Sequence, residues 1–444
     1  MGCLTAEVEL RCVPDAPKHP LLNVRYRMRS RFLPLLAGAL LAATACADQN
    51  PLDPAAAAFK KSNVTEPTTG PWQRIVEGET GPGSLYAIYV PREWNGDAVF
   101  YAHGIRPPLA PITLDDQDNF FAVRDELGAL GYAFVYSSFS ENGLVVKDGA
   151  LRTHQLRGLL ASEIRGQPVR SYLAGYSLGA GIAVYLAEKF PTQYDGALTM
   201  CGMIGGSQIE LDYAGHVRAL FDYFYPGVLP GDVTQVTPTL TAAQIQALVV
   251  GAIVANPTGL YAIASTVQTP LAYAPIGSVT NPADPAFQTL VESLVIALYY
   301  QHIGTNDMVM RTHGHTPVDN SQTVYAVGTL VIPNPALAFL IAQANQGVQR
   351  YTATPDALNY NEKWFAPTGD LKIPVVSVHN LWDPLVPFFH EAAYSQVVAE
   401  AGASAMLLQR AVPNYGHCNF STSLVVSSFQ TLVEWVETGV KPAN

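Results

Sequence analysis

The sequence has few charged residues and no long apolar run. Of its 444 residues, 14% are charged and 49% are hydrophobic, whereas ordinary globular proteins are roughly 25% charged. Because aromatic and aliphatic residues are plentiful, this composition indicates a folded chain and argues against disorder. No stretch reaches the 18 or so consecutive apolar residues that indicate a membrane-spanning helix.

Positive charge is also scarce. The chain has 25 Lys and Arg residues against 36 Asp and Glu residues, which gives a net charge of −11. A protein with this balance offers no cationic surface for phosphates, so we expect no nucleic-acid partner.

The longest apolar run lies near the N-terminus. From Met28, two arginines precede an apolar stretch, Phe32 to Ala45, that ends in small residues. This layout is typical of a signal peptide, which we place at residues 28–45. We interpret residues 1–27 as the result of a start codon assigned too early.

Cys46 follows directly and makes the same segment resemble a bacterial lipoprotein signal, with Cys46 as the lipidated first residue. Ordinary cleavage and secretion is the alternative, since Ala43 occupies the place where such signals usually carry leucine. The sequence therefore predicts an extracytoplasmic protein, which is either a lipoprotein anchored to a bacterial membrane or a secreted or periplasmic protein.

The rest of the chain divides into a linker and a folded body. Residues 46–71 are rich in Ala, Pro and polar residues, and we interpret them as an anchor and linker. Apolar, β-branched and aromatic runs then alternate with helical patterns, which predicts an α/β fold with a mostly parallel sheet flanked by helices. The expected strands are 85–90, 98–104, 132–139, 169–175 and 195–202, with helices near 148–163 and 178–190.

Residues 206–365 interrupt this alternation. Three segments have helical patterns, 241–255, 284–304 and 335–346, and Pro- and Gly-rich connections join them. We interpret the interruption as a large helical cap, inserted before the penultimate core strand. The core, residues 72–205 and 366–444, then resumes with strands at 373–380 and 406–413 and helices near 388–402 and 423–438.

The strand that ends near Ala174 runs into the sequence GYSLGAG, which has the pattern of a nucleophile elbow. Glycine is needed at Gly175 and Gly179 because the turn from strand to helix leaves no room for side chains there. The same turn presents the hydroxyl of Ser177.

Two further residues fall in the chain order serine, acid, histidine. Asp383 follows the strand at 373–380, and His417 follows the next strand. With these residues the sequence resembles the α/β-hydrolase fold over about residues 72–440. The resemblance implies a catalytic triad in which His417 is the general base for Ser177 and Asp383 orients its imidazole. It also implies an oxyanion hole made by the backbone N–H groups of Leu178 and Ile105.

The resemblance places Cys201 and Cys418 at the catalytic edge of the sheet, because Cys201 ends the strand after the elbow and Cys418 follows His417. We therefore predict a disulfide between them. The arrangement is similar to that of the tannase and feruloyl-esterase group, in which a disulfide ties the histidine loop to the nucleophile. In that group the first cysteine directly precedes the serine, a position that Tyr176 occupies here.

These features predict a serine esterase that cleaves small or polymeric carboxylic esters through an acyl-enzyme, without a cofactor. Two alternatives stay open, a peptidase or amidase of the same fold and a catalytically silent hydrolase fold that binds at the cell surface. We expect no metal site, and we interpret His313 and His315 as part of a polar loop. The sequence does not indicate the oligomeric state.

Overall fold

The computed structural model describes residues 62–81, 83–115, 120–234 and 240–443, all within one compact unit. Several predictions lie outside the described residues. These are the early start at 1–27, the signal peptide at 28–45, the lipidation site Cys46 and the linker residues 46–61.

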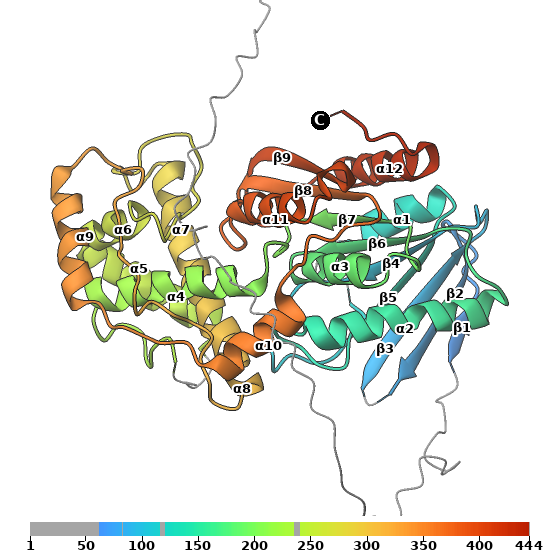
Figure 1. Ribbon diagram of the computed structural model, residues 1–444, viewed down its shortest axis with the longest axis horizontal. Helices are drawn as coiled ribbons and strands as arrows, with labels where there is room; N and C mark the ends of the chain where they lie inside the picture. Colours follow the sequence, from blue (N-terminus) through green and yellow to red (C-terminus); the bar gives the residue numbers. More distant parts are fainter. Residues whose placement is uncertain (1–61, 82, 116–119, 235–239, 444) are drawn as a thin grey trace, which may run out of the picture. The chain divides into compact units, whose positions relative to one another are not determined.

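A single sheet of nine strands organises the described chain (Figure 1), in the order β1-β2-β3-β5-β4-β6-β7-β8-β9. Neighbouring strands are antiparallel from β1 to β5 and parallel from β5 to β9. The strands are β1 Asn63–Thr65, β2 Trp72–Thr80, β3 Ser84–Pro91, β4 Ala98–Ala102, β5 Ala133–Ser137, β6 Ser171–Tyr176, β7 Gly196–Met200, β8 Val375–Trp382 and β9 Leu407–Tyr415.

The central strands β4, β5, β6 and β7 are buried along their whole length because both faces of the sheet are covered. Successive side chains of a strand point to opposite faces. In β4, for example, Phe100 packs into one hydrophobic cluster, whereas Val99 and Tyr101 pack into the other. This double burial explains the near-continuous apolar runs in the sequence.

Helices cover both faces. On one face lie α2 (Val146–Ile164), α3 (Leu178–Lys189) and α11 (Phe389–Glu400), and Tyr394 of α11 donates a hydrogen bond to Glu188 of α3 over 3.2 Å. On the other lie α1 (Phe121–Ala129) and α12 (Thr422–Thr438), which contact each other and the sheet. A short 3₁₀ helix, Ser404–Met406, precedes β9.

A helical insertion, Ser207–Phe365, connects β7 to β8. Its helices are α4 Ser207–Phe224, α5 Ala242–Ala255, α6 Pro257–Ala264, α7 Pro285–Tyr300, a π-helix at Gln301–Thr305, α8 Asn306–Arg311, α9 Pro335–Gly347 and α10 Pro355–Phe365. The insertion has its own hydrophobic core, in which Phe221 of α4, Val249 of α5 and Leu294 of α7 are buried. A second hydrophobic core lies between the sheet and helices α2 and α3, and we call it the core under the sheet. The first half of α4 packs into this core through Leu211.

Within the described residues, no single helix is both long and apolar enough to cross a bilayer. Helices α5 and α6 together reach the required length and composition, but a bend of 104° separates them.

The predicted fold class is confirmed. The sheet is mostly parallel with helices on both faces, and a helical insertion precedes the penultimate strand, so the chain has the α/β-hydrolase fold. One boundary is wrong. Strand β1 lies inside the predicted linker, 46–71, and pairs with β2. Its three exposed residues, Asn63 to Thr65, carry no apolar alternation that could have revealed a strand.

Candidate active site

Ser177 lies at a sharp turn between β6 and α3. Its backbone has φ 53° and ψ −120°, so a non-glycine residue adopts a positive φ. Such a conformation costs on the order of 1–3 kcal/mol and persists only where the surroundings hold it. Here the Ser177 N–H donates to the carbonyl of Met200 over 2.9 Å, and the Ser177 carbonyl accepts from Ala180 over 3.0 Å.

The two glycines around Ser177 are required by close backbone approach. A β-carbon at Gly175 would overlap the carbonyl of Gly179, and a β-carbon at Gly179 would overlap the carbonyl of Ala102 at the end of β4. The first turn of α3 therefore packs directly on the end of β4, as the predicted nucleophile elbow requires.

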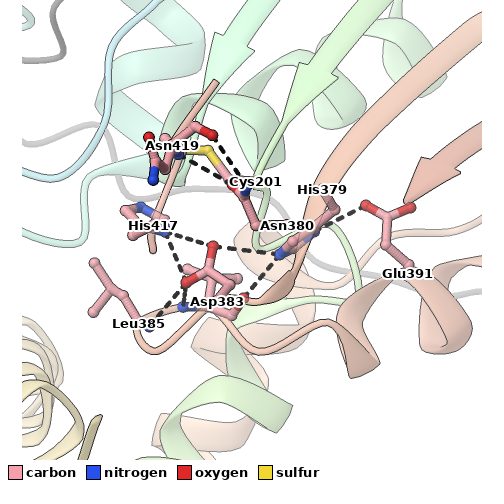
Figure 2. The surroundings of a disulfide bond; sticks show 10 residues. Cys201, His379, Asn380, Asp383, Leu385, Glu391, His417 and Asn419 are labelled. Carbon is pink, nitrogen blue, oxygen red and sulfur yellow. Dashed lines mark hydrogen bonds and ion pairs between the residues drawn. A yellow bond between two sulfur atoms is a disulfide. The ribbon is translucent and has the colours of Figure 1, made fainter. Parts of the chain in front are cut away.

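His417 and Asp383 are hydrogen-bonded to each other. Nδ1 of His417 lies 2.8 Å from Oδ2 and 3.1 Å from Oδ1 of Asp383 (Figure 2). Because an ionised carboxylate can only accept, Nδ1 is the donor. The other ring nitrogen, Nε2, is therefore the one that can take a proton.

A disulfide brings the His417 loop to the serine turn. Cys418 is bonded to Cys201, with the two α-carbons 5.2 Å apart, which is the pairing that the sequence predicts. Cys201 directly follows Met200, whose carbonyl accepts from Ser177. The elbow, the disulfide and the histidine are thus linked through consecutive short contacts at the carboxyl edge of the parallel strands.

Ser177 and His417, both of which the structure describes, are not joined by a hydrogen bond. The hydrogen bonds of the His417 ring go to Asp383. Ser177 is 6% exposed. Catalytic hydrogen bonds in unliganded sites are often long and tighten when substrate binds, so the triad stays a prediction.

The charge of Asp383 is buried and well compensated. The carboxylate is fully buried, and Oδ1 accepts from the backbone N–H groups of Leu385 and Val386, each over 2.9 Å. Burial alone would raise the pKa of Asp383. The charges of His417 and His379 and the hydrogen bond from His417 outweigh that effect and lower the pKa to about 2.

The predicted oxyanion donors lie on the two segments that meet at the elbow. Leu178 is the first residue of α3, a position whose N–H has no partner within the helix. Ile105 lies in the loop that follows β4 and packs against the core under the sheet. The role of either N–H group stays a prediction.

His379 lies beside Asp383 and Glu391 lies beside His379, and neither residue was predicted from the sequence. His379, on β8, lies 3.6 Å from Oδ2 of Asp383 and is itself bonded to Glu391 of α11. The signal in the sequence is slight, because it consists of one histidine within an apolar strand, four residues before the acid.

Three side chains beside the site have atoms that can ligate metals. In the described part of the chain, the histidine and cysteine atoms that come together are those of Cys201, His417 and Cys418, all within 4.8 Å of one another. The two sulfurs form the disulfide, so they are not thiolate ligands. His315 lies 3.8 Å from the exposed Asp356.

Several aromatic residues of the insertion are buried in hydrophobic cores. Phe221, Tyr213 and Tyr225 belong to the insertion's own core, and Tyr300 belongs to the core under the sheet. Tyr213 also contacts the ring of Phe389, at the start of α11, with centroids 5.7 Å apart.

No family model matches the chain. An o-phthalyl amidase of Xanthobacter agilis is 26% identical over 99 residues, so the match spans about a fifth of each chain, 21% in both cases. Among solved structures, feruloyl esterase B of Aspergillus oryzae is similar at 16% identity and a TM-score of 0.45, covering 85% of this chain and 83% of that one. Candida antarctica lipase A is similar at 14% identity and a TM-score of 0.42, covering 87% and 83%.

Proposed function

We propose that the protein is a serine hydrolase that cleaves carboxylic esters through an acyl-enzyme. The observation that carries the proposal is the bonded pair of His417 and Asp383, tied by the Cys201–Cys418 disulfide to a strained serine turn. A strained backbone at the serine and a carboxylate-bound imidazole are two costly features that nucleophilic catalysis by serine needs.

The proposed reaction has two halves. Oγ of Ser177 attacks the ester carbonyl carbon while its proton passes to Nε2 of His417, and the imidazolium then protonates the departing alkoxide as the C–O bond breaks. Water, deprotonated by His417, attacks the acyl-enzyme in the same way and releases the carboxylic acid. Asp383 holds the ring and stabilises the imidazolium in both halves.

Negative charge develops on the carbonyl oxygen in each half. We assign the N–H groups of Leu178 and Ile105 to that oxygen, because the packing of α3 on the end of β4 brings their two segments together. One such donor contributes on the order of 3–4 kcal/mol in the transition state.

The helical insertion borders this edge of the sheet. Tyr415, two residues before His417, donates a hydrogen bond from its hydroxyl to the Thr289 carbonyl of α7 over 3.2 Å and lies 3.3 Å from the Ser293 hydroxyl. We propose that α4 and α7 form one wall of the substrate site, which would make the insertion the part of the chain that selects the ester.

An amide substrate is the second candidate, because the local sequence match is to an amidase. The same triad would serve, with His417 protonating a departing amine. Matched ester and amide substrates with one acyl group distinguish the two proposals, since the ratio of their kcat/KM values shows which bond the site is built to cleave.

The substitution Ser177→Ala tests the nucleophile. We expect kcat on p-nitrophenyl and aromatic esters to fall by about 10⁴–10⁶-fold, because the attacking oxygen is lost. The matched control is Ser162→Ala, which removes an exposed hydroxyl on α2 and should leave kcat unchanged. Equal activity of Ser177→Ala and the unmodified protein would refute the assignment. Inactivity of the unmodified protein on esters and amides alike would favour a binding role.

A further inference from the structure

A second buried histidine lies directly behind the acid of the proposed triad. His379 projects from β8 and is fully buried. Its Nδ1 lies 3.0 Å from Oε1 of Glu391, and its Nε2 lies 2.8 Å from the carbonyl oxygen of Val386. Figure 2 shows Glu391, His379, Asp383 and His417 following one another across the site.

The partners of His379 indicate that both of its ring nitrogens carry a proton. A carbonyl oxygen can only accept, so Nε2 donates to Val386. Glu391 is surrounded by donors, since Ser377 donates to its Oε1 over 2.6 Å and Gln409 to its Oε2 over 2.6 Å. Because both oxygens of Glu391 accept in this way, Nδ1 of His379 is the donor in its contact with Glu391 as well.

The electrostatics agree with this geometry. Burial by itself would lower the pKa of His379, but the hydrogen bond to Glu391 and the charges of the Glu391 and Asp383 carboxylates outweigh burial and raise the pKa to about 10. At neutral pH His379 is therefore a buried cation that lies between the side chains of Asp383 and Glu391.

His379 is coupled to Asp383 in two ways. Its charge lies 3.6 Å from Oδ2 of Asp383. It also binds the carbonyl of Val386, the residue whose N–H donates to Oδ1 of Asp383. Through this one residue, His379 holds the turn that presents the carboxylate to His417.

We propose that His379 is a positioning residue of the triad, held as a cation by Glu391, which fixes the turn from Asp383 to Val386 and keeps the carboxylate ionised and directed at His417. The inference rests on the proposed function, because it assigns a role in the same reaction. It does not require His379 to touch substrate.

Other titratable groups also surround this cluster, and one of them provides a control. Those facing His379 or Asp383 are Glu210 and Tyr213 on α4, His390 and Glu391 on α11, Tyr415 on β9 and His417 after β9.

His390 differs in charge from His379. Its Nδ1 accepts from the Gly205 N–H over 3.2 Å, so only Nε2 donates, to Glu210 over 2.8 Å. Burial lowers the pKa of His390 to about 3, and the ring is neutral.

The first measurement needs no substrate. A histidine whose pKa is raised from 6.5 to about 10 on folding contributes stability in full below about pH 6.5 and loses it as the pH rises through about 10. We therefore expect the urea midpoint of the purified protein to exceed that of His379→Gln at pH 6, and the difference to shrink steadily between pH 7 and pH 10. His390→Gln should show a difference that is constant over this range. A constant difference for His379→Gln would overturn the proposal, because it would mean that the ring is merely packed.

The second measurement concerns catalysis. If His379 positions Asp383, then His379→Gln lowers kcat by roughly ten- to a hundredfold with little change in KM, because misplacement of a catalytic group affects the chemical step. His390→Gln should retain the kcat of the unmodified protein. Equal kcat values for His379→Gln and the unmodified protein would overturn the positioning role. If the proposed function is wrong, the Ser177→Ala variant retains activity, which is a separate result. The urea measurement still tests the charge of His379 in that case, because it uses no substrate.

Discussion

Asp383 carries its charge at a fully buried site, and this charge makes the free energy of unfolding depend on pH. Its pKa falls from 3.8 in the unfolded chain to about 2 in the folded protein. A carboxyl group with a lowered pKa stabilises the fold above its unfolded value, and this contribution disappears as the pH falls through the folded value. The stabilisation, about 2 kcal/mol, is thus present above about pH 4 and lost by about pH 2.

The substitution Asp383→Asn tests this residue. We expect kcat to fall by about 10⁴-fold, because an amide favours the wrong tautomer of His417. We also expect the free energy of unfolding, measured by urea titration, to lie below that of the unmodified protein at pH 6 and to approach it as the pH falls below 4. The control is Asp370→Asn, an exposed carboxylate beside Lys372. A pH-independent gap for Asp383→Asn would contradict the ionised state of the acid.

Single residues differ in how far the sequence reveals them. Ser177, Asp383 and His417 could be singled out because each follows an apolar strand and the order of the three is distinctive. His379 could not, since a histidine inside an apolar strand suggests a packed core residue. Its partner Glu391 lies on a helix and becomes adjacent only when α11 folds back on the sheet.

At the scale of elements, the elbow depends on how closely α3 approaches β4. We predict that Gly179→Ala destabilises the protein by about 1–3 kcal/mol or prevents folding, because the new methyl group meets the Ala102 carbonyl and backbone must move. The matched control is Gly181→Ala, two residues further along α3, where the methyl group would meet only the Met203 carbonyl at 3.6 Å. That change should be neutral or stabilising by up to about 1 kcal/mol.

Thermal unfolding of the two variants checks this prediction. If Gly179→Ala is as stable and as active as Gly181→Ala, the approach of α3 to β4 is not the reason for glycine at this position.

The buried strands of the sheet could be predicted, whereas elements with a mixed pattern of polar and apolar residues were missed. Strands β3 to β8 are buried along most of their length, and these strands and β9 were each expected close to their observed bounds. Strand β2 was missed because its three fully buried residues, Trp72, Val76 and Thr80, are separated by charged and polar ones. Helix α4 was missed because Glu210, Arg218 and other polar residues are buried along it, which obscures the apolar periodicity.

At the scale of the whole molecule, one covalent bond joins distant parts of the sequence. The disulfide links Cys201 and Cys418 across 217 residues. A bridge that closes so long a loop stabilises mainly by restricting the unfolded chain, typically by 2–5 kcal/mol. Such a bond persists in oxidising compartments, which supports the extracytoplasmic location expected from the sequence.

We predict that the double substitution Cys201→Ser with Cys418→Ser lowers the free energy of unfolding by about 2–5 kcal/mol. It should also reduce kcat, because His417 adjoins Cys418 and loses its covalent attachment to the serine turn. Denaturant unfolding with and without reductant measures the effect, since reductant should weaken the unmodified protein and leave the double variant unchanged. A double variant with full stability and activity would show that the bond constrains neither the unfolded chain nor the histidine loop.

The same bond determines what a protease can do to the molecule. The closed loop contains the entire helical insertion, whereas Ser177 precedes the loop and His417 lies at its far end. A single cut anywhere in the insertion therefore yields two fragments, one with the serine and one with the histidine, that remain one covalent species until they are reduced. A protein cleaved once in the insertion thus keeps Ser177 and His417 in one disulfide-linked molecule.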